Sequence, residues 1–169
     1  ICNLGSGKSV PPGQETLVEW KRVFDLNFWS TVSLVELSSD LLSQTNGKII
    51  CISSICGSEV VSGAPITYSV SKAALNSYVK SVSFPLSQRG ISINAIAPGN
   101  VLFKGSTWDK KLKANPVEVK NYIADNVPLN KFASPADISS LCSFLLSPMS
   151  NFTTGSIFTV DGGQTRSLK

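Results

Sequence analysis

Two kinds of apolar spacing alternate along the chain. Apolar residues recur every three or four positions from Thr16 to Gly47, and this spacing predicts a long helix capped by Thr16. Glu19 stands three residues after Thr16 and completes the pattern of a capping box. The stretch from Tyr68 to Leu86 is also typical of a helix, which is expected to close near Arg89.

Short, continuous apolar runs stand between these helical stretches. Residues 48–52 and 91–97 are each typical of a strand that is covered on both faces, and 156–160 is predicted to be a final strand. Residues 1–4 resemble the tail of another buried strand. A further helix is predicted from Ser134-Pro135 to about residue 146, because proline is favoured at the first helical position.

Strands that alternate with helices in this way predict an α/β fold. We expect one doubly wound parallel sheet with helices on both faces, in a single domain over residues 1–169. The polar stretch at about 100–131 is predicted to hold one or two helices and to lie over the ends of the strands. The chain begins with Ile1 inside a strand-like run, so we expect it to be part of a longer domain.

Composition excludes several classes of function. The net charge of +4 is spread out without a basic run, which argues against a nucleic-acid partner. No apolar run reaches the 18 or more residues of a membrane span, so no membrane partner is expected. The chain has no histidine, which excludes histidine-based triads and argues against a metal site with zinc. Its four cysteines form no C-x-x-C pair and are interpreted as small core residues of a cytoplasmic protein.

The most informative candidate chemistry is the pair Tyr68 and Lys72. These residues stand four positions apart in a predicted helix, so their side chains leave the same face. A lysine ammonium near a tyrosine favours the phenolate and lowers its pKa from about 10. Such a tyrosine suits proton exchange with a substrate oxygen near neutral pH.

The segment Gly5-Ser-Gly-Lys-Ser9 suggests a different chemistry, a phosphate-binding loop. The full pattern of that loop needs a glycine five residues before the Gly-Lys pair, and Cys2 stands there instead. We therefore do not interpret the segment as a nucleoside triphosphate site.

Several motifs occur in an order that resembles the short-chain dehydrogenase/reductase family. Cys2-Asn-Leu-Gly5 is similar to the family's turn after its fourth strand, although Cys2 and Leu4 depart from the family's residues. The segments 47–57 and 94–99 are similar to the strands that carry the catalytic serine and the turn beside the nicotinamide. Tyr68 and Lys72 match the family's catalytic pair, and residues 128–163 resemble its C-terminal pattern.

The resemblance implies a Rossmann-type fold and an NAD(P)-dependent oxidoreductase that interconverts a carbonyl and a secondary alcohol. It implies that Tyr68 is the acid/base, that Lys72 supports it and binds the nicotinamide ribose, and that Ser54 donates a hydrogen bond to the substrate oxygen. Asn27 matches an asparagine that holds a relay water. The remaining positions implied for NAD or NADP binding are Asn3, Gly5, Pro98, Gly99 and Val101.

Some of these assignments have alternatives. Ser53 could supply the hydroxyl instead of Ser54, Asn27 could be an ordinary surface residue, and Asn94 is more typical of a structural asparagine. Where the family often has a threonine that reaches the cofactor, this chain has Phe103, which could instead line the substrate pocket. Ser106 or Thr107 could take the place of that threonine.

The resemblance also implies what lies outside this chain. It places residue 1 in the family's fourth strand, so the N-terminal strands, with the glycine-rich turn and the residue that selects NAD or NADP, are missing. We therefore expect this chain alone to be inactive. It further implies a small-molecule substrate, a lid at about 100–131, and a homodimer or homotetramer. The alternative hypothesis is a non-catalytic family member that serves as a binding or assembly module.

Overall fold

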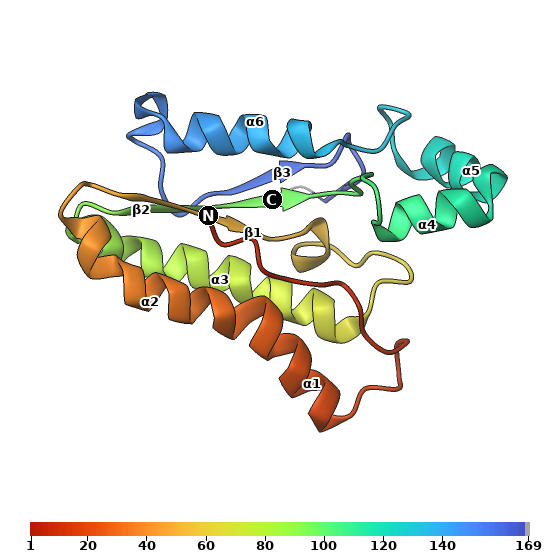
Figure 1. The fold of residues 1–169 in the computed structure, drawn as a ribbon, viewed down its shortest axis with the longest axis horizontal. Helices are drawn as coiled ribbons and strands as arrows, with labels where there is room; N and C mark the ends of the chain where they lie inside the picture. Colours follow the sequence, from red (N-terminus) through yellow and green to blue (C-terminus); the bar gives the residue numbers. More distant parts are fainter. Residues whose placement is uncertain (168–169) are drawn as a thin grey trace.

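The sheet of the protein is parallel and lies between two layers of helices (Figure 1). The structure, a computed structural model, describes residues 1–167. Its three strands are β1 (Lys48–Ile52), β2 (Ser92–Pro98) and β3 (Ile157–Val160), in the order β1-β2-β3. Both pairings are parallel. This arrangement confirms the predicted α/β class with a Rossmann-type sheet and helices on both faces.

The predicted first strand is reduced to a single bridge. Cys2 pairs with Cys51 of β1, with its N–H donating to the Ile50 carbonyl and its carbonyl accepting from the Ile52 N–H. All four cysteines have free thiols, and three of them, Cys2, Cys51 and Cys142, are buried as core residues. Cys56 is only half-buried.

The apolar spacing predicts one regular helix before Gly47, and the structure differs from this prediction. The segment consists of α1 (Leu17–Phe24), a π-helical turn η1 (Asp25–Trp29) and α2 (Ser30–Ser43). The Thr16 hydroxyl accepts from the Glu19 N–H, which confirms the cap. The predicted capping box is wrong in its second half, because the Glu19 carboxylate binds Arg22 and Ser9.

Helix α3 (Ile66–Gln88) begins two residues before the predicted start at Tyr68 and ends at Gln88, next to the predicted end near Arg89. Together with α1 and α2 it covers one face of the sheet, while α6 (Pro135–Leu146) covers the other (Figure 1). The core beneath α2 and α3 contains Val35, Ile49, Cys51, Leu75, Val79 and Ile93. The core beneath α6 contains Ile50, Ile96, Cys142 and Leu145.

The segment predicted as a lid contains two helices, α4 (Thr107–Ala114) and α5 (Pro116–Asn126), which project beyond one end of the strands (Figure 1). They have a small core of their own, built from Val119, Val127 and Phe132 with Trp108 and Tyr122. Two single turns complete the list of helices, η2 (Ile55–Gly57) and η3 (Pro148–Ser150). No helix among residues 1–167 is long and apolar enough to cross a membrane.

Candidate active site

The candidate catalytic residues gather where β1 and β2 end. Ile52 is in register with Ile96, and the Ser53 N–H donates to the Ile96 carbonyl, so Ser53 and Ser54 leave the sheet beside the end of β2. Helix α3 begins after the loop that follows β1 and brings Tyr68 and Lys72 back to this edge. In parallel sheets this edge is where ligands bind.

Lys72 is an almost fully buried cation, with 4% of its surface exposed. Its Nζ donates to the Ile52 carbonyl at 2.9 Å and lies 5.8 Å from the centroid of the Tyr68 ring. Burial lowers the pKa of Lys72 to about 8, because a charged amine loses hydration there. At neutral pH the ammonium form still predominates. Only one of its three donors is engaged by a described residue.

The pKa of Tyr68 is raised, where the sequence predicts that it is lowered. Burial disfavours the phenolate, and a hydrogen bond with the Ser54 hydroxyl offsets only part of that effect. The ammonium group of Lys72 lies beside the ring and does not reverse the direction of the shift. Tyr68 is therefore a protonated phenol at neutral pH, which is the form that can donate a proton.

The two candidate serines have different surroundings. The Ser53 hydroxyl donates to the side-chain oxygen of Asn76 at 2.6 Å and so points towards α3. The Ser54 hydroxyl accepts from the Cys56 N–H at 3.2 Å, and its interaction with the Tyr68 phenol offsets part of the rise in the pKa of that phenol. Of the two, Ser54 is the serine whose hydroxyl acts on the pKa of the tyrosine.

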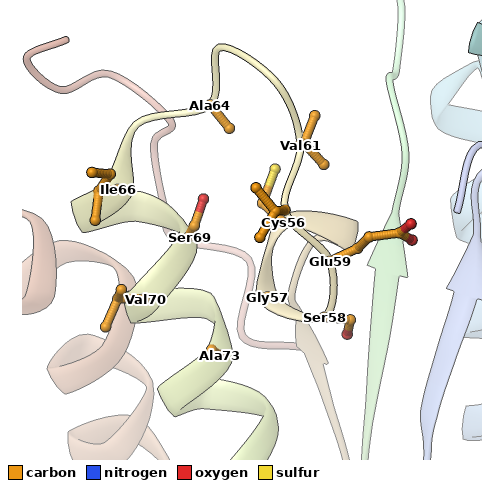
Figure 2. Close-up of a pocket in the computed structure, with 11 residues that line it drawn as sticks. Cys56, Gly57, Ser58, Glu59, Val61, Ala64, Ile66, Ser69, Val70 and Ala73 are labelled. Carbon is orange, nitrogen blue, oxygen red and sulfur yellow. The ribbon is translucent and has the colours of Figure 1, made fainter. Parts of the chain in front are cut away.

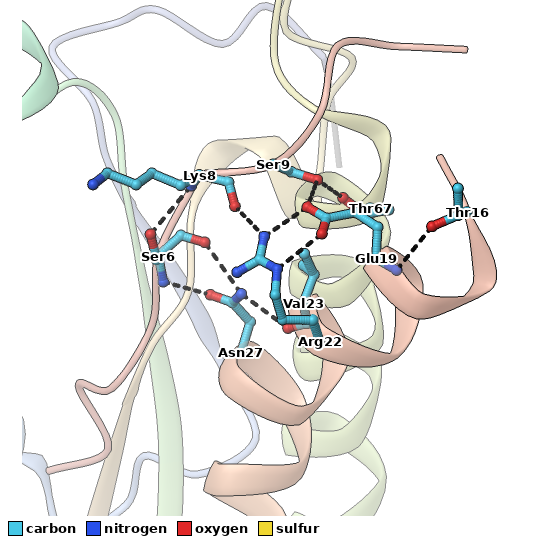
Figure 3. Close-up of polar contacts among 9 residues, drawn as sticks. All are labelled: Ser6, Lys8, Ser9, Thr16, Glu19, Arg22, Val23, Asn27 and Thr67. Carbon is cyan, nitrogen blue, oxygen red and sulfur yellow. Dashed lines mark hydrogen bonds and ion pairs between the residues drawn. The ribbon is translucent and has the colours of Figure 1, made fainter. Parts of the chain in front are cut away.

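Asn27 lies inside the fold, not on the helix surface, with none of its area exposed. It stands in the π-helical turn, a feature that is frequent at functional sites. Its Oδ1 accepts from the Ser6 N–H at 2.9 Å, and its Nδ2 donates to the Ser6 and Val23 carbonyls (Figure 3). These bonds attach the loop after Cys2 to the helix. The same loop is also held at Ser9, whose hydroxyl meets Glu19 and Thr67.

Gly5 brings the main chain against the candidate catalytic residues. A Cβ added at Gly5 would lie 2.8 Å from Asn27 Oδ1 and 3.3 Å from Lys72 Nζ. A Cβ at Gly7 would lie 3.9 Å from the Tyr68 ring. The loop thus passes close to three of the predicted site residues, whereas the side chain of Asn3 is exposed to solvent. A phosphate-binding loop requires a helix that starts directly after it. Here the next helix, α1, begins only at Leu17.

The predicted cofactor wall continues from β2. Pro98 is the last residue of β2 and pairs with Val160, and the Gly99 N–H donates to the Val160 carbonyl. A Cβ at Gly99 would meet Asp161 and Gln164, so glycine allows the two segments to pack together. Val101 forms an isolated bridge with Ala133.

Asn100, between these residues, is a site residue that the sequence did not single out. Its Oδ1 accepts from the Trp108 indole N–H at 3.0 Å, and its Nδ2 donates to Gln164 at 2.7 Å and to the Tyr122 hydroxyl at 3.2 Å. One amide thereby connects the end of β2 to α4, α5 and the C-terminal segment. Asn76 was also missed, because a polar residue on a helix carries no pattern of its own.

Other sequence-based alternatives are decided by local contacts. The Ser106 hydroxyl caps α4 by accepting from the Asp109 N–H, so it is already engaged. Phe103 is about half exposed and has no described contact with the candidate catalytic residues. Asn94 is structural, as expected, because its amide bonds Thr153 and Ser156.

Two cavities flank the loop that carries Ser54. One, of about 420 Å³, is mostly apolar and lies between residues 56–64 and the outer side of α3, where Val61, Ile66 and Val70 surround it (Figure 2). The other, of about 300 Å³, is more polar and lies between that loop, α5 and the C-terminal segment. Its polar lining includes Glu59, Ser62, Tyr122, Asn126, Gln164, Thr165 and Arg166.

Comparison with known proteins identifies the class to which this fold and site belong. A family model described as enoyl-(acyl carrier protein) reductase matches residues 2–165. The chain belongs to the short-chain dehydrogenase/reductase family.

Individual relatives agree with this assignment. The chain is 34% identical over 145 residues to an isoepoxydon dehydrogenase of Penicillium expansum, covering 85% of this chain and 56% of that protein. A solved NADPH-bound short-chain oxidoreductase of Pseudomonas aeruginosa is 26% identical with a TM-score of 0.87, covering 97% of this chain and 64% of that one. A solved 4-hydroxyisoleucine dehydrogenase complexed with NADH is 26% identical with a TM-score of 0.85, at 95% and 65% coverage. The chain thus spans less than two thirds of the length of these relatives.

Proposed function

We propose that this chain carries the catalytic half of an NAD(P)-dependent oxidoreductase that interconverts a carbonyl and a secondary alcohol. The observation that carries the proposal is the cluster of Ser54, Tyr68 and Lys72 at the carboxyl edge of the sheet. The relatives, which include dehydrogenases and reductases, support the general class. The substrates of those relatives differ, and none is transferred to this chain.

Each residue has a role in the proposed reaction. In the direction of reduction, the protonated Tyr68 phenol donates its proton to the oxygen that gains negative charge. The Ser54 hydroxyl donates a hydrogen bond to the same oxygen and stabilises that charge. The Lys72 ammonium then lies beside the newly formed phenolate and stabilises it. Asn27 acts indirectly, because it holds the loop at Ser6 close to Tyr68 and Lys72.

The residues present fit a nicotinamide cofactor. Gly5 leaves no side chain between its backbone and Lys72, and the Lys72 ammonium retains donors that could bind ribose hydroxyls. When bound, the cofactor would supply or accept the hydride. Gly99 and Pro98 would border it from the end of β2, with Val101 beyond them, and Asn3 would lie on the side of the N-terminal loop.

The segment 100–131 is proposed as the lid over the substrate. Helices α4 and α5 share a core of their own and are connected to the sheet edge through Asn100. The polar cavity between α5 and the loop after Ser54 is the space that a substrate could enter beneath this lid.

A homo-oligomer is proposed from the apolar surface of the long helices. Leu37 and Leu41 of α2 are 79% and 69% exposed, and Phe84 of α3 is 72% exposed. Large exposed apolar side chains that gather on neighbouring helices are typical of protein–protein interfaces. Sedimentation analysis of the full-length protein tests this proposal.

The experiment that tests the proposed function is titration with NADH and NADPH, followed by nicotinamide fluorescence. Saturable binding to this chain is expected if its residues suffice to hold the nicotinamide half, and the tighter ligand identifies the cofactor. If this chain does not bind, the same titration of the full-length protein decides between an enzyme and a binding module. A full-length protein that is folded and binds neither cofactor would contradict the proposal and favour the binding module.

A further inference from the structure

Asn76 lies on α3, one turn after Lys72 and two turns after Tyr68, and contacts the loop that carries Ser54. Its Oδ1 accepts from the Ser53 hydroxyl at 2.6 Å. Its Nδ2 donates to the Gly57 carbonyl at 3.2 Å and to the Ser58 hydroxyl at 3.1 Å. The amide therefore binds the chain immediately before Ser54 and again three and four residues after it.

The loop is also pressed against the backbone of the same helix. A Cβ added at Gly57 would lie 2.6 Å from the carbonyl carbon of Lys72 and 2.7 Å from its oxygen. Backbone approaches this close are possible only at glycine. Asn76 hydrogen-bonds the carbonyl of the same Gly57. The loop is therefore held to α3 both by close backbone packing and by hydrogen bonds.

Ser54 itself has no described bond to Asn76. Its position depends on the residues around it, because the one hydrogen bond of its hydroxyl to a described residue comes from the Cys56 N–H. Loss of Asn76 would leave the buried Ser53 hydroxyl without its partner and would free the loop at Gly57.

We propose that Asn76 is a positioning residue that fixes the distance of the Ser54 hydroxyl from the Tyr68 phenol. Tyr68, Lys72 and Asn76 then form one row on α3, in which the first two residues contact the reacting groups and the third sets the serine against them. The inference rests on the proposed function, because Ser54 has to be positioned only if its hydroxyl meets a substrate oxygen.

A double-mutant cycle in the full-length protein tests this inference. Asn76→Ala is expected to lower kcat on the order of tenfold to a hundredfold, since displacement of a catalytic group by about 1 Å has effects of this size. The cofactor Kd is expected to stay unchanged. In the Ser54→Ala background, Asn76→Ala should add less than about a twofold loss, because there is no hydroxyl left to position. An equal loss in both backgrounds would overturn the inference.

Control variants separate positioning from general destabilisation. Ser77→Ala changes the next, exposed residue of α3 and should leave kcat unaltered. If Asn76→Ala does not fold, Ser53→Ala removes one of the three bonds and should produce a smaller loss with the same dependence on Ser54. If Ser53→Ala lowers kcat by the same factor in the Ser54→Ala background, the inference is equally overturned.

A measurement without turnover keeps the inference distinct from the proposed function. Amide hydrogen exchange at Cys56, whose N–H donates to Ser54, should become faster in Asn76→Ala and stay unchanged in Ser77→Ala. Unchanged exchange at Cys56 in Asn76→Ala would overturn the inference even if the enzyme is active. Faster exchange in a protein without any oxidoreductase activity would instead support the positioning of the loop and contradict the proposed function.

Discussion

The loop that carries Ser54 and the proposed lid at 100–131 border the same candidate site and are held in different ways. The loop is fastened to α3 at several points, through Asn76 and through the close approach of Gly57. The proposed lid has its own small apolar core, and its hydrogen bonds to the rest of the protein include one from the Asn100 side chain to Gln164 and one from the Leu129 N–H to the Gly162 carbonyl.

This difference separates two requirements of the proposed enzyme. Proton transfer needs atoms fixed to within a fraction of an ångström, and Tyr68 and Lys72 belong to a long helix packed on the sheet. A substrate has to enter and leave, and a segment with an independent core can shift as a unit when few bonds fix it. We therefore expect substitutions in the first region to change kcat, and substitutions in the second to change KM.

The largest effect is expected for Tyr68→Phe in the full-length protein. Removal of the phenol removes the proton donor, so kcat should fall by about 10²–10⁴-fold. The ring remains, so thermal unfolding should occur near the wild-type temperature. Steady-state kinetics and a thermal melt measure both quantities, and near-wild-type turnover would refute the assignment of Tyr68.

Lys72→Met should lower turnover and weaken cofactor binding while it stabilises the fold. The native pKa is about 8 and the unfolded value is 10.5, so at pH 7 both states are protonated and the native state bears the cost of burial. Removing that charge should raise the free energy of unfolding by up to about 3 kcal/mol at pH 7.

The sign of this effect can be checked against pH. Above pH 8 the native lysine becomes neutral while the unfolded one stays charged, so the wild type gains stability up to about pH 10.5. The advantage of Lys72→Met should therefore shrink over that interval in urea unfolding. Lys80→Met removes an exposed lysine of the same helix and is the matched control.

Asn100→Ala should act on the lid. Loss of the bonds to Trp108, Tyr122 and Gln164 should raise KM by about tenfold, the size expected for one or two net hydrogen bonds, with a smaller change in kcat. The fluorescence of Trp108 should shift as its indole loses its partner. Asn121→Ala, at an exposed position of α5, is the control, and a fall in kcat alone would contradict the separation of the two regions.

The smallest effect is expected at the N-terminal loop. Hydrogen bonds from Arg22 and Ser9 lower the pKa of Glu19 to about 2, so the carboxylate stabilises the fold at neutral pH. This contribution should be lost as the pH falls from about 4.5 towards 2. Glu19→Gln should remove that part of the acid dependence in melts at pH 3 and pH 6, and an unchanged dependence would exclude Glu19 as its source.

Much of the fold could be predicted because apolar spacing reports burial directly. The runs at 48–52 and 91–97 became β1 and β2, the second displaced by one residue, and Ser134-Pro135 does begin α6. The π-helical turn was not predicted, because no single-residue pattern distinguishes it from a regular helix. Residues 1–4 were predicted as the tail of a strand, and the structure has only a bridge at Cys2. The length of a strand depends on its pairing with neighbouring strands, which a short apolar run does not report.

The candidate site was only partly predictable from the same information. Tyr68 and Lys72 lie together because a helix fixes the spacing of four, whereas the direction of the Tyr68 pKa depends on burial. Asn76 and Asn100 act through contacts with residues distant in the sequence, which a pattern along the chain does not contain.

The π-helical turn has a consequence for the angular phase of the first helix. Its buried residues, Val23, Asn27, Thr31, Val35 and Ser39, are spaced by four throughout. In a helix of 3.6 residues per turn, a spacing of four rotates by about 40° at each step, so this row would wind away from the sheet. The wider turn at 25–29 takes up part of that rotation and lets Asn27 and Val35 face the same side. A regular helix over the same residues would turn the buried row of α2 further about the helix axis, away from the side that Asn27 faces.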